Sequence, residues 1–543
     1  MAAVTASSPG GGGGDALTTC TWNIAAVNNN PLEYWTTYDS PGYMQLMVDV
    51  ERMIDNPGDR DVPLGTIFPA FEDLTTRMAA VEGLNEGVDE VRAIWESDLS
   101  KRSLVSGFLK DKAIGSKRFI SMPDRFTNTI NLASSSEPNC RPAVTNNYVG
   151  DLGSFDAWWA AWAAFMFDTE LFVPTRSGPA FRLPCKLLSK ISRAKYPALS
   201  EEEERVSLPM QVLCLALFDC ALVHIMNTLS PSGEWLTIKR RLCDALFVNK
   251  QARTLEILSG PAYASCDVIF LQEVAGNFVA KLQESPLGTS HHVLPPAKLD
   301  SARDQNSVVL LKKSTFPDTA AGGAGSGAFL EVSDDVRATL GGDAGVMDGD
   351  IMVVRAADAA GRPYVLATFH GDTEGLQSPG VLEALHATVG RMDGAPSLLF
   401  GLDANVYEQP STGKKPHLHY LEWVAKYEAL GLASNWGPPY GSADAEAEAG
   451  FDPVACRTTF NARTFLQPQL QKAVRLDDFK AEGDCNPKDY LLFPAGDFAV
   501  TATRIDNTGE GGVPGSAPYA ETPIPSLVWP SDHMAVLTTL QRR

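Results

Sequence analysis

Residues 397–407 read SLLFGLDANVY, an apolar run followed by two polar residues, Asp403 and Asn405. The run from Ser397 to Leu402 has the length of a buried strand and is short for a helix. Asp-x-Asn alone is most often a turn, because both side chains bond to their own backbone. The stretch therefore predicts a core strand that carries a carboxylate and an amide at its end.

Other apolar runs along the chain also have polar residues at their ends. A sheet presents the ends of its strands along one edge, so these side chains are predicted to lie together. They are Asn23 after the run from Leu17, Glu273 in Cys266–Val274, His370 after Leu366–Phe369, Asp489 before Tyr490–Phe493, and Ser531-Asp532-His533 before Ala535–Leu540.

Between about residues 31 and 235 the apolar residues recur at helical spacing instead. Residues 155–172 are rich in tryptophan and phenylalanine, and residues 208–229 are almost wholly apolar. We interpret both stretches as helices packed in a core. The alternative for the tryptophan-rich stretch is a helix that binds a membrane surface or a protein partner.

Composition restricts the classes of function. The chain has 543 residues and a formal charge of −21, which argues against a globally basic nucleic-acid-binding surface. A local basic cleft or a bound divalent cation remains compatible with that charge. The nine cysteines contain no Cys-x-x-Cys pair. The longest unbroken apolar run, Ala157–Phe167, is shorter than the roughly 20 residues of a membrane span. Without a recognisable leader, the chain is expected to be cytoplasmic or nuclear.

The ordered set Asn, Gln-Glu, His, Asp-x-Asn, Asp and Ser-Asp-His resembles the endonuclease/exonuclease/phosphatase superfamily. That superfamily includes deoxyribonucleases, abasic-site endonucleases, deadenylases, neutral sphingomyelinases and inositol polyphosphate 5-phosphatases. Each matching string is short, but the six follow the family's order. They are TWNIAAVNNNP, VIFLQEV, LATFHGDT, LFGLDANVY, KDYLLF and PSDHMAV.

The resemblance implies a four-layer α/β sandwich of two mixed β-sheets flanked by helices. A large, mainly helical insertion would follow the first strand. The expected organisation is a disordered tail over residues 1–16, the first strand of the phosphoesterase domain in 17–30, the insertion in 31–235, and the remainder of the phosphoesterase domain in 236–543.

The resemblance also implies roles for individual residues. Asn23, Glu273 and Asp532 would hold Mg²⁺ or Mn²⁺, which favour oxygen ligands. Asp403 would orient or deprotonate the attacking water, with Asn405 beside it. His533, oriented by Asp489, would contact the phosphate, and His370 would lie near the leaving oxygen or a phosphate oxygen.

The sequence departs from the family pattern at two points. Leu402 stands between Gly401 and Asp403, where the family usually writes Gly-Asp-x-Asn. Gly371 follows His370 where many relatives carry an apolar residue.

Substrate contacts are expected between the Asp403 and Asp489 motifs. There Arg463 could clamp a phosphate and Phe460 could stack on a base. The alternative for this pair is a surface arginine and a core phenylalanine.

The sequence thus predicts a Mg²⁺-dependent phosphoester hydrolase, with nucleic acid or a nucleotide favoured as the phosphorylated substrate. The alternatives are a phosphoinositide or sphingolipid phosphoesterase, and an inactive binding scaffold on the same fold. The helical insertion is the expected site for any protein partner.

Overall fold

The computed structural model describes residues 16–135, 137–175, 177–300, 305–318, 329–342, 345–413, 415–437, 455–511 and 522–543. The tail predicted over residues 1–16 lies outside the described residues except for Ala16.

The chain divides into two compact units. The sheet unit comprises Met1–Ala26, Gln251–Phe460 and Asp484–Arg543, and the helical unit comprises Val27–Lys250 and Asn461–Gly483. The helical unit is therefore wider than the predicted insertion at 31–235, and it includes a segment that the sequence analysis placed in the phosphoesterase domain.

Segment 461–483 belongs to the helical unit because it is bonded to the start of that unit. The backbone N–H of Trp35 donates to the carbonyl of Ala462 at 3.0 Å, and the Trp35 indole donates to the carbonyl of Val474 at 2.9 Å. The N–H of Thr464 donates to the carbonyl of Glu33 at 2.7 Å.

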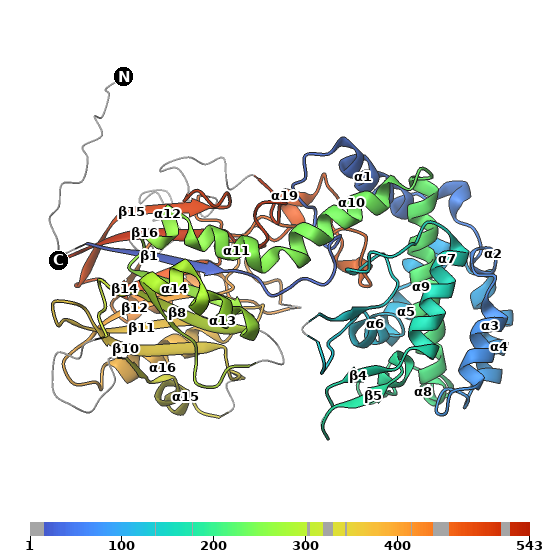
Figure 1. Ribbon diagram of the computed structural model, residues 1–543, viewed down its shortest axis with the longest axis horizontal. Coiled ribbons are helices and arrows are strands. Elements are labelled where there is room, and N and C mark those ends of the chain that lie inside the picture. The colour runs from blue at the N-terminus through green and yellow to red at the C-terminus, as the bar shows by residue number, and fades with distance from the viewer. Residues whose placement is uncertain are drawn as a thin grey trace. The chain divides into compact units, whose positions relative to one another are not determined.

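The first sheet of the sheet unit has six strands and is mixed (Figure 1). Its parallel pair is β1 with β6, and the other neighbours are antiparallel. The strands, in spatial order, are β15 (Phe498–Asp506), β16 (Ala535–Arg542), β1 (Ala16–Asn23), β6 (Val268–Val274), β8 (Asn306–Lys312) and β7 (His291–Leu294).

The second sheet also has six strands and is mixed. Here β11 and β12 are parallel, and the other neighbours are antiparallel. The strands, in spatial order, are β13 (Leu432–Ser434), β14 (Asp489–Pro494), β12 (Ser397–Asp403), β11 (Pro363–His370), β10 (Ile351–Ala357) and β9 (Leu330–Glu331).

Both faces of the second sheet are buried, which explains why its strands read as continuous apolar runs. In β12, Leu399 packs with Phe270 of the first sheet in one core cluster. Leu398, Phe400 and Leu402 belong to the other core cluster, with residues of the flanking helices. The alternation follows the two-residue period of a strand.

Helices complete the outer layers of the sheet unit (Figure 1). Those packed on the second sheet are α15 (Ser333–Leu340), α16 (Ser378–Val389) and α17 (Tyr420–Ala429). Those beside the first sheet are α11 (Lys250–Ser259), α12 (Pro261–Ala264), α13 (Gly276–Glu284) and α14 (Pro286–Ser290). The predicted four-layer α/β sandwich is confirmed.

The helical unit consists mainly of helices, as predicted for the insertion. They are α1 (Pro41–Asp55), α2 (Leu64–Ile67), α3 (Phe71–Ala79), α4 (Val88–Ser97), α5 (Lys112–Lys117), α6 (Ser121–Thr127), α7 (Phe155–Ala163), α8 (Glu201–Arg205), α9 (Ser207–Leu229), α10 (Glu234–Cys243) and α19 (Phe479–Glu482). Single turns of π-helix occupy η3 (Leu104–Leu109), η4 (Ala164–Asp168) and η6 (Asp244–Val248). Short 3₁₀ turns are η1 (Gly58–Arg60), η2 (Leu99–Lys101), η5 (Pro184–Leu187) and η7 (Leu470–Lys472). The hairpins are β2 (Thr129–Ile130) with β3 (Asn139–Cys140) and β4 (Leu171–Val173) with β5 (Ala180–Arg182).

Helix α9 forms the core of the helical unit. Helices α1, α2, α4, α6, α7 and α8 contact it, and the side chains on every face of α9 are buried. Among the described residues, α9 is the one helix long and apolar enough to cross a membrane, but 78% of its most apolar window is buried inside the protein. We therefore interpret α9 as a core helix.

The buried acid of α9 is paired. Asp219 of α9 accepts from the Arg141 guanidinium at 2.7 Å and from the Trp162 indole at 2.8 Å. Trp158 and Trp162 have no exposed surface, so these tryptophans pack in the core as the sequence analysis favoured.

Candidate active site

Strand register brings the predicted site residues together. Asn23, the last residue of β1, lies opposite Gln272 in the parallel strand β6, directly before Glu273. In the second sheet His370 lies opposite Asp403, and Asp403 lies opposite Asp489. The ends of β1, β6, β11 and β12 and the start of β14 therefore carry the predicted site residues.

Asn23 joins the two sheets at this edge. Its Nδ2 donates to Glu273 Oε1 at 3.0 Å and to Asp403 Oδ2 at 2.9 Å. Its Oδ1 accepts from the backbone N–H of Ala25 at 2.9 Å. Two carboxylates from different sheets thus converge on one buried amide.

Glu273 is held in a strained backbone conformation. Its φ is +56°, a left-handed value that L residues rarely adopt, and the β6–β8 pairing shifts register between Leu271 and Val274. The N–H of Ala26 donates to Glu273 Oε2 at 2.7 Å. Asn405 is left-handed as well, with a φ of +50°. Strain of this kind is common at functional sites.

His533 is fixed through both its ring and its backbone. Its Nδ1 lies 2.9 Å from Asp489 Oδ2, which leaves Nε2 facing Asp403 Oδ2 at 3.5 Å. The indoles of Trp22 and Trp529 both donate to the carbonyl of His533, at 3.2 and 2.8 Å, and the two rings stack on each other. His533 therefore has one available orientation.

His370 also faces the carboxylates. Its Nε2 lies 3.3 Å from Glu273 Oε1 and 3.7 Å from Asp403 Oδ2. The N–H of Asn405 donates to Asp403 Oδ1 at 2.9 Å, so both oxygens of Asp403 have defined neighbours. The predicted set of His370, Asp403, Asn405, Asp489 and His533 is brought together by the structure.

The acidic and basic side chains of the site affect the pKa values of Glu273 and His533. Burial favours neutral Glu273, but the charge of His370 and the hydrogen bonds from Ala26 and Asn23 hold the pKa of Glu273 below its ordinary value. Burial likewise opposes a charged His533, yet the carboxylates of Asp489 and Asp403 raise the pKa of His533 above its ordinary value. The surroundings therefore favour the charged forms of Glu273 and His533.

The donor set fits a hard divalent cation. Glu273 Oε1 lies 3.0 Å and Asp403 Oδ2 lies 2.9 Å from Asn23 Nδ2, so two carboxylate oxygens lie close together. Hard divalent cations favour oxygen ligands of this kind. Asp403, Asp489 and His533 also offer ligand atoms within 4.8 Å of one another. We favour the oxygen set, because His533 Nδ1 and Asp489 Oδ2 are already bonded to each other.

The third predicted metal ligand, Asp532, is half-buried and adjacent to His533 in the chain. Its negative charge adds to those of Asp489 and Asp403 in raising the pKa of His533 against the effect of burial.

The two predicted substrate residues are placed differently from the cluster. Phe460 belongs to the sheet unit, but only 3% of its surface is exposed. Arg463 belongs to the helical unit, where it forms an ion pair with Glu33 and lies over the Tyr34 ring. Their contact with substrate remains a prediction.

Sequence reasoning gave no role to Gln272, which lies under the site. Its Nε2 donates to Thr21 Oγ1 at 3.1 Å and to Thr368 Oγ1 at 2.8 Å, one in each sheet. The glutamine was visible in the VIFLQEV string, but its bonds across the sheets depend on packing.

A second missed group supports the loop that precedes Asp489. Lys488 Nζ donates to Asp484 Oδ2 at 2.7 Å and lies over the Tyr407 ring. The hydroxyl of Thr458 accepts the N–H groups of Lys488 and Asp489, both at 3.1 Å. These bonds fix the start of β14 and hence the carboxylate of Asp489.

Two mixed six-stranded sheets with outer helices, and the six motifs meeting at one sheet edge, are what the sequence resemblance implied. The sheet unit therefore has the four-layer α/β sandwich that was expected from that resemblance. The family model described as "Domain of unknown function (DUF8234)" matches residues 61–240, which lie in the helical unit. The sequence matches none of the curated proteins.

Solved structures similar to this chain include TDP2 from D. rerio in complex with a single-strand DNA product. It is 13% identical, with 55% of this chain and 95% of that chain covered and a TM-score of 0.32. The human Nocturnin catalytic domain with bound sulfate is 13% identical over 54% and 87%, with a TM-score of 0.33. An endonuclease/exonuclease/phosphatase from Beutenbergia cavernae is 16% identical over 54% and 66%, with a TM-score of 0.32.

Proposed function

We propose that this chain is a Mg²⁺- or Mn²⁺-dependent hydrolase of phosphoester bonds. The observation that supports the proposal is the meeting of Asn23, Glu273 and Asp403 with the His533–Asp489 pair. Such groups can supply a general base and a hydrogen-bond donor for the transfer of a phosphoryl group to water.

Each side chain has a defined task in this proposal. Glu273 would hold the metal ion, and Asn23 would join it through Oδ1 once its amide turned, since Nδ2 now faces the carboxylates. The ion would offset negative charge growing on the phosphoryl oxygens. Asp403 accepts a proton from the attacking water, because its carboxylate is held in place by the Asn23 amide and the Asn405 N–H. His533, charged and oriented by Asp489, donates from Nε2 to a phosphoryl oxygen.

His370 and the side chain of Asn405 complete the proposed arrangement. Among the described residues, the Asn405 side-chain amide has no hydrogen-bond partner, so it is available to the substrate or the attacking water. His370 Nε2 lies at the same edge, where it can donate to a phosphoryl or leaving-group oxygen.

We favour nucleic acid or a nucleotide as substrate. A chain with a net charge of −21 has no polybasic stretch that would hold it at an anionic lipid surface. A phosphoinositide or sphingolipid headgroup is the alternative, and both substrate classes use the same phosphoryl chemistry.

The test is hydrolysis of a phosphoester panel with Mg²⁺, Mn²⁺ or a chelator. The panel contains single-stranded and duplex nucleic acid, nucleotides, inositol phosphates and sphingomyelin. Glu273→Gln and Asp403→Asn are each expected to lower kcat by roughly 10²- to 10⁴-fold. The matched control is Glu256→Gln, because Glu256 is an exposed acid on α11 that pairs with Arg253 at the surface.

Metal-dependent turnover that both site variants lose and Glu256→Gln retains would support the proposal. Folded protein that turns over none of the panel with either metal would instead favour the scaffold alternative. Activity that persists in Asp403→Asn at the level of the control would contradict the role given to Asp403.

A further inference from the structure

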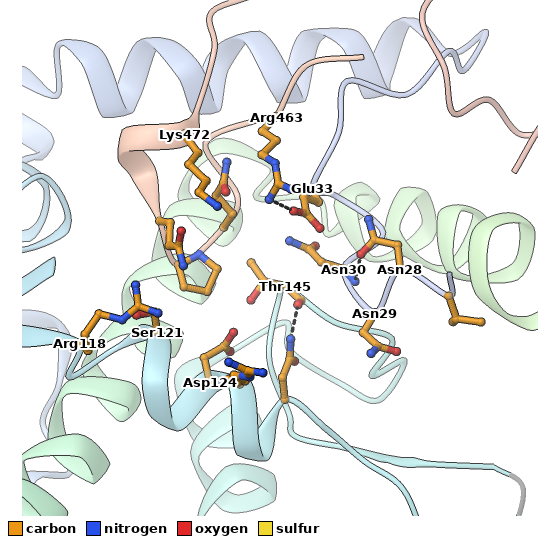
Figure 2. A pocket seen from close by; sticks show the side chains of 16 residues that line it. Asn28, Asn29, Asn30, Glu33, Arg118, Ser121, Asp124, Thr145, Arg463 and Lys472 are labelled. Atoms are coloured by element: carbon orange, nitrogen blue, oxygen red, sulfur yellow. Dashed lines mark hydrogen bonds and ion pairs between the residues drawn. The ribbon is translucent and has the colours of Figure 1, made fainter. Parts of the chain in front are cut away.

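We propose that the helical unit contains a second, separate binding site, for a small phosphate-bearing anion. The site is a cavity of about 460 Å³ whose lining residues all belong to the helical unit. Three parts of the chain build it: the Asn28–Asn30 turn with Glu33, the region around α5 and α6, and segment 461–483 (Figure 2). Its size falls in the range of small-molecule sites.

The cavity carries an excess of basic side chains. Arg118, Arg125, Arg463 and Lys472 line it, against two acids, Glu33 and Asp124. Both acids are already paired, Glu33 with Arg463 and Asp124 with Arg141 at 2.7 Å.

Two of the basic groups have no acid of their own. Among the described residues, no carboxylate pairs with Arg118 or Arg125. In a chain with a formal charge of −21, such a concentration of guanidinium groups provides a local attraction for an anion that the rest of the molecule would repel.

Polar atoms in the cavity wall also lack protein partners. Among the described residues, Arg118 Nε, Asn128 Oδ1 and Thr145 Oγ1 are buried without a hydrogen bond. Thr145 has no exposed surface at all. Buried polar groups are usually bonded, so unbonded ones around a polar cavity indicate that something else supplies the partner.

The backbone conformation of Arg118 is an observation independent of the unbonded polar atoms. Arg118 ends α5 in the left-handed conformation, with a φ of +65°, a position where glycine is the favoured residue. A large charged side chain at this position costs conformational free energy that glycine would avoid. The guanidinium lies over the Tyr196 ring and is therefore held in place.

The wall of the cavity is preformed. Asn30 Nδ2 donates to the carbonyl of Leu466 at 2.8 Å, and Asn30 Oδ1 accepts from the N–H of Leu32 at 3.1 Å. These bonds tie the asparagine turn to segment 461–483. Figure 2 shows Arg463 and Lys472 reaching into the cavity from that segment, while Arg118 enters from a different wall.

The side chains that line the cavity indicate which class of ligand it can bind. Apart from Val27 and Pro468, the lining residues are polar, and none has an aromatic ring on which a base could stack. Side-chain amides from Asn28, Asn29 and Gln469 suit hydroxyl and phosphate oxygens. We therefore infer either a short oligophosphate or a phosphorylated polyol, whose shared chemistry is the phosphate group.

The test is calorimetric titration of the full chain in metal-free buffer with tripolyphosphate and, separately, with fructose 1,6-bisphosphate. Arg118→Gly is expected to weaken binding by about ten-fold or more, since a hydrogen bond to a charged group is lost. Its melting temperature should stay the same or rise, because glycine suits the left-handed backbone. A merely structural arginine would instead lower the melting temperature.

Two further variants make the result independent of any one substitution. Arg125→Gln should weaken binding while its exposed side chain leaves folding unchanged. The matched control, Arg52→Gln, removes an exposed arginine of α1 outside the cavity and should bind like the native protein. Preference for the bisphosphate identifies a polyol ligand, and equal binding identifies the phosphate groups alone.

The proposal is overturned by failure of both anions to bind at millimolar concentration, or by unchanged binding in Arg118→Gly and Arg125→Gln. Binding lost in Glu273→Gln but kept in the arginine variants would place the anion at the sheet edge and equally overturn it. An oligonucleotide that binds where neither small anion does would assign the cavity to a macromolecule instead.

Discussion

At the scale of single residues, two positions beside the site have left-handed backbones. Substituting each of them distinguishes an effect on activity from an effect on stability. Asn405 has a φ of +50° and Ala25 a φ of +57°, and both lie beside the Asn23–Asp403 contact. Glycine adopts this region without the steric cost that a Cβ imposes. The two positions differ in that Asn405 carries a functional side chain and Ala25 does not.

We expect Asn405→Gly to lower the hydrolysis rate by about 100-fold while changing the free energy of unfolding by no more than about 1 kcal/mol. Ala25→Gly is the matched control and should keep both activity and stability. Steady-state kinetics and urea unfolding measure the two quantities. An active Asn405→Gly variant would remove Asn405 from the proposed chemistry.

The hydrogen bond between His533 and Asp489 gives a second prediction at this scale. Asp489→Asn keeps the shape of the side chain but removes the charge that favours a protonated, correctly oriented His533. The rate should fall by roughly 10²-fold or more. Asp393→Asn, an exposed aspartate in a turn of the same unit, should react like the native protein. Equal rates for the two variants would mean that Asp489 does not position His533.

At the scale of elements, β12 depends on Gly401 for the spacing of the two sheets. A Cβ at this position would lie 2.4 Å from the ring of Phe270 in the opposite sheet, closer than real contacts allow. Gly401→Ala should therefore lower the free energy of unfolding by about 1–3 kcal/mol. Gly496→Ala meets no atom within 4 Å and should cost far less. Similar unfolding curves for both variants would show that the sheets can separate without penalty.

The strands were predictable because strands buried on both faces appear in the sequence as continuous apolar runs. Residues such as Leu398, Phe400 and Leu402 alternate with Leu399 between two cores, so the run is apolar throughout and its polar end stands out. The bulge that turns Glu273 was not predictable, since no glycine marks the left-handed position. The bonds of Gln272 to both sheets depend on which strands face each other, which one sequence does not encode locally.

Helix α10 supplies a prediction about pH. Burial lowers the pKa of Lys239 to about 8, although the lysine donates to the carbonyls of Ala143 and Tyr148. The pKa in the unfolded chain is about 10.4, so folding penalises the charged lysine below pH 8, and the penalty disappears as the pH rises to 10.4. The contribution of Lys239 to stability must therefore increase with pH.

The comparison with Lys239→Met isolates this contribution, because the other titrating groups are common to both proteins. Between pH 8 and 10 the free energy of unfolding of the native protein, minus that of Lys239→Met, should rise by up to about 1.4 kcal/mol per pH unit. Urea unfolding at several pH values measures the difference. A constant difference across that window would mean that folding does not lower the pKa of Lys239, which would then keep its proton in the folded protein.

At the scale of the whole molecule, the division into units was only partly readable from the sequence. The change from strand-like to helical spacing near residue 31 is local, and it was found. Segment 461–483 has no such signal, because its partners lie far away in the chain: Arg463 pairs with Glu33, 430 residues earlier. Arg463 therefore looked like part of the region around Asp403 and Asp489, although it belongs to the helical unit.

Because segment 461–483 belongs to the helical unit, its removal together with residues 27–250 has a predictable effect. Replacing both 27–250 and 461–483 with short Gly-Ser linkers should leave a soluble sheet unit, because its two core clusters contain no residue of either segment. Replacing only 27–250 should leave Ala462, Phe465 and Leu466 without the neighbours that now bury them. Exposed apolar surface of this kind promotes association. The single replacement should therefore elute as aggregates in size-exclusion chromatography and bind a hydrophobic dye, whereas the double replacement should elute as one species. Identical behaviour of the two variants would mean that segment 461–483 packs on the sheet unit as well, and that its bonds to residues 32–35 do not determine where it belongs.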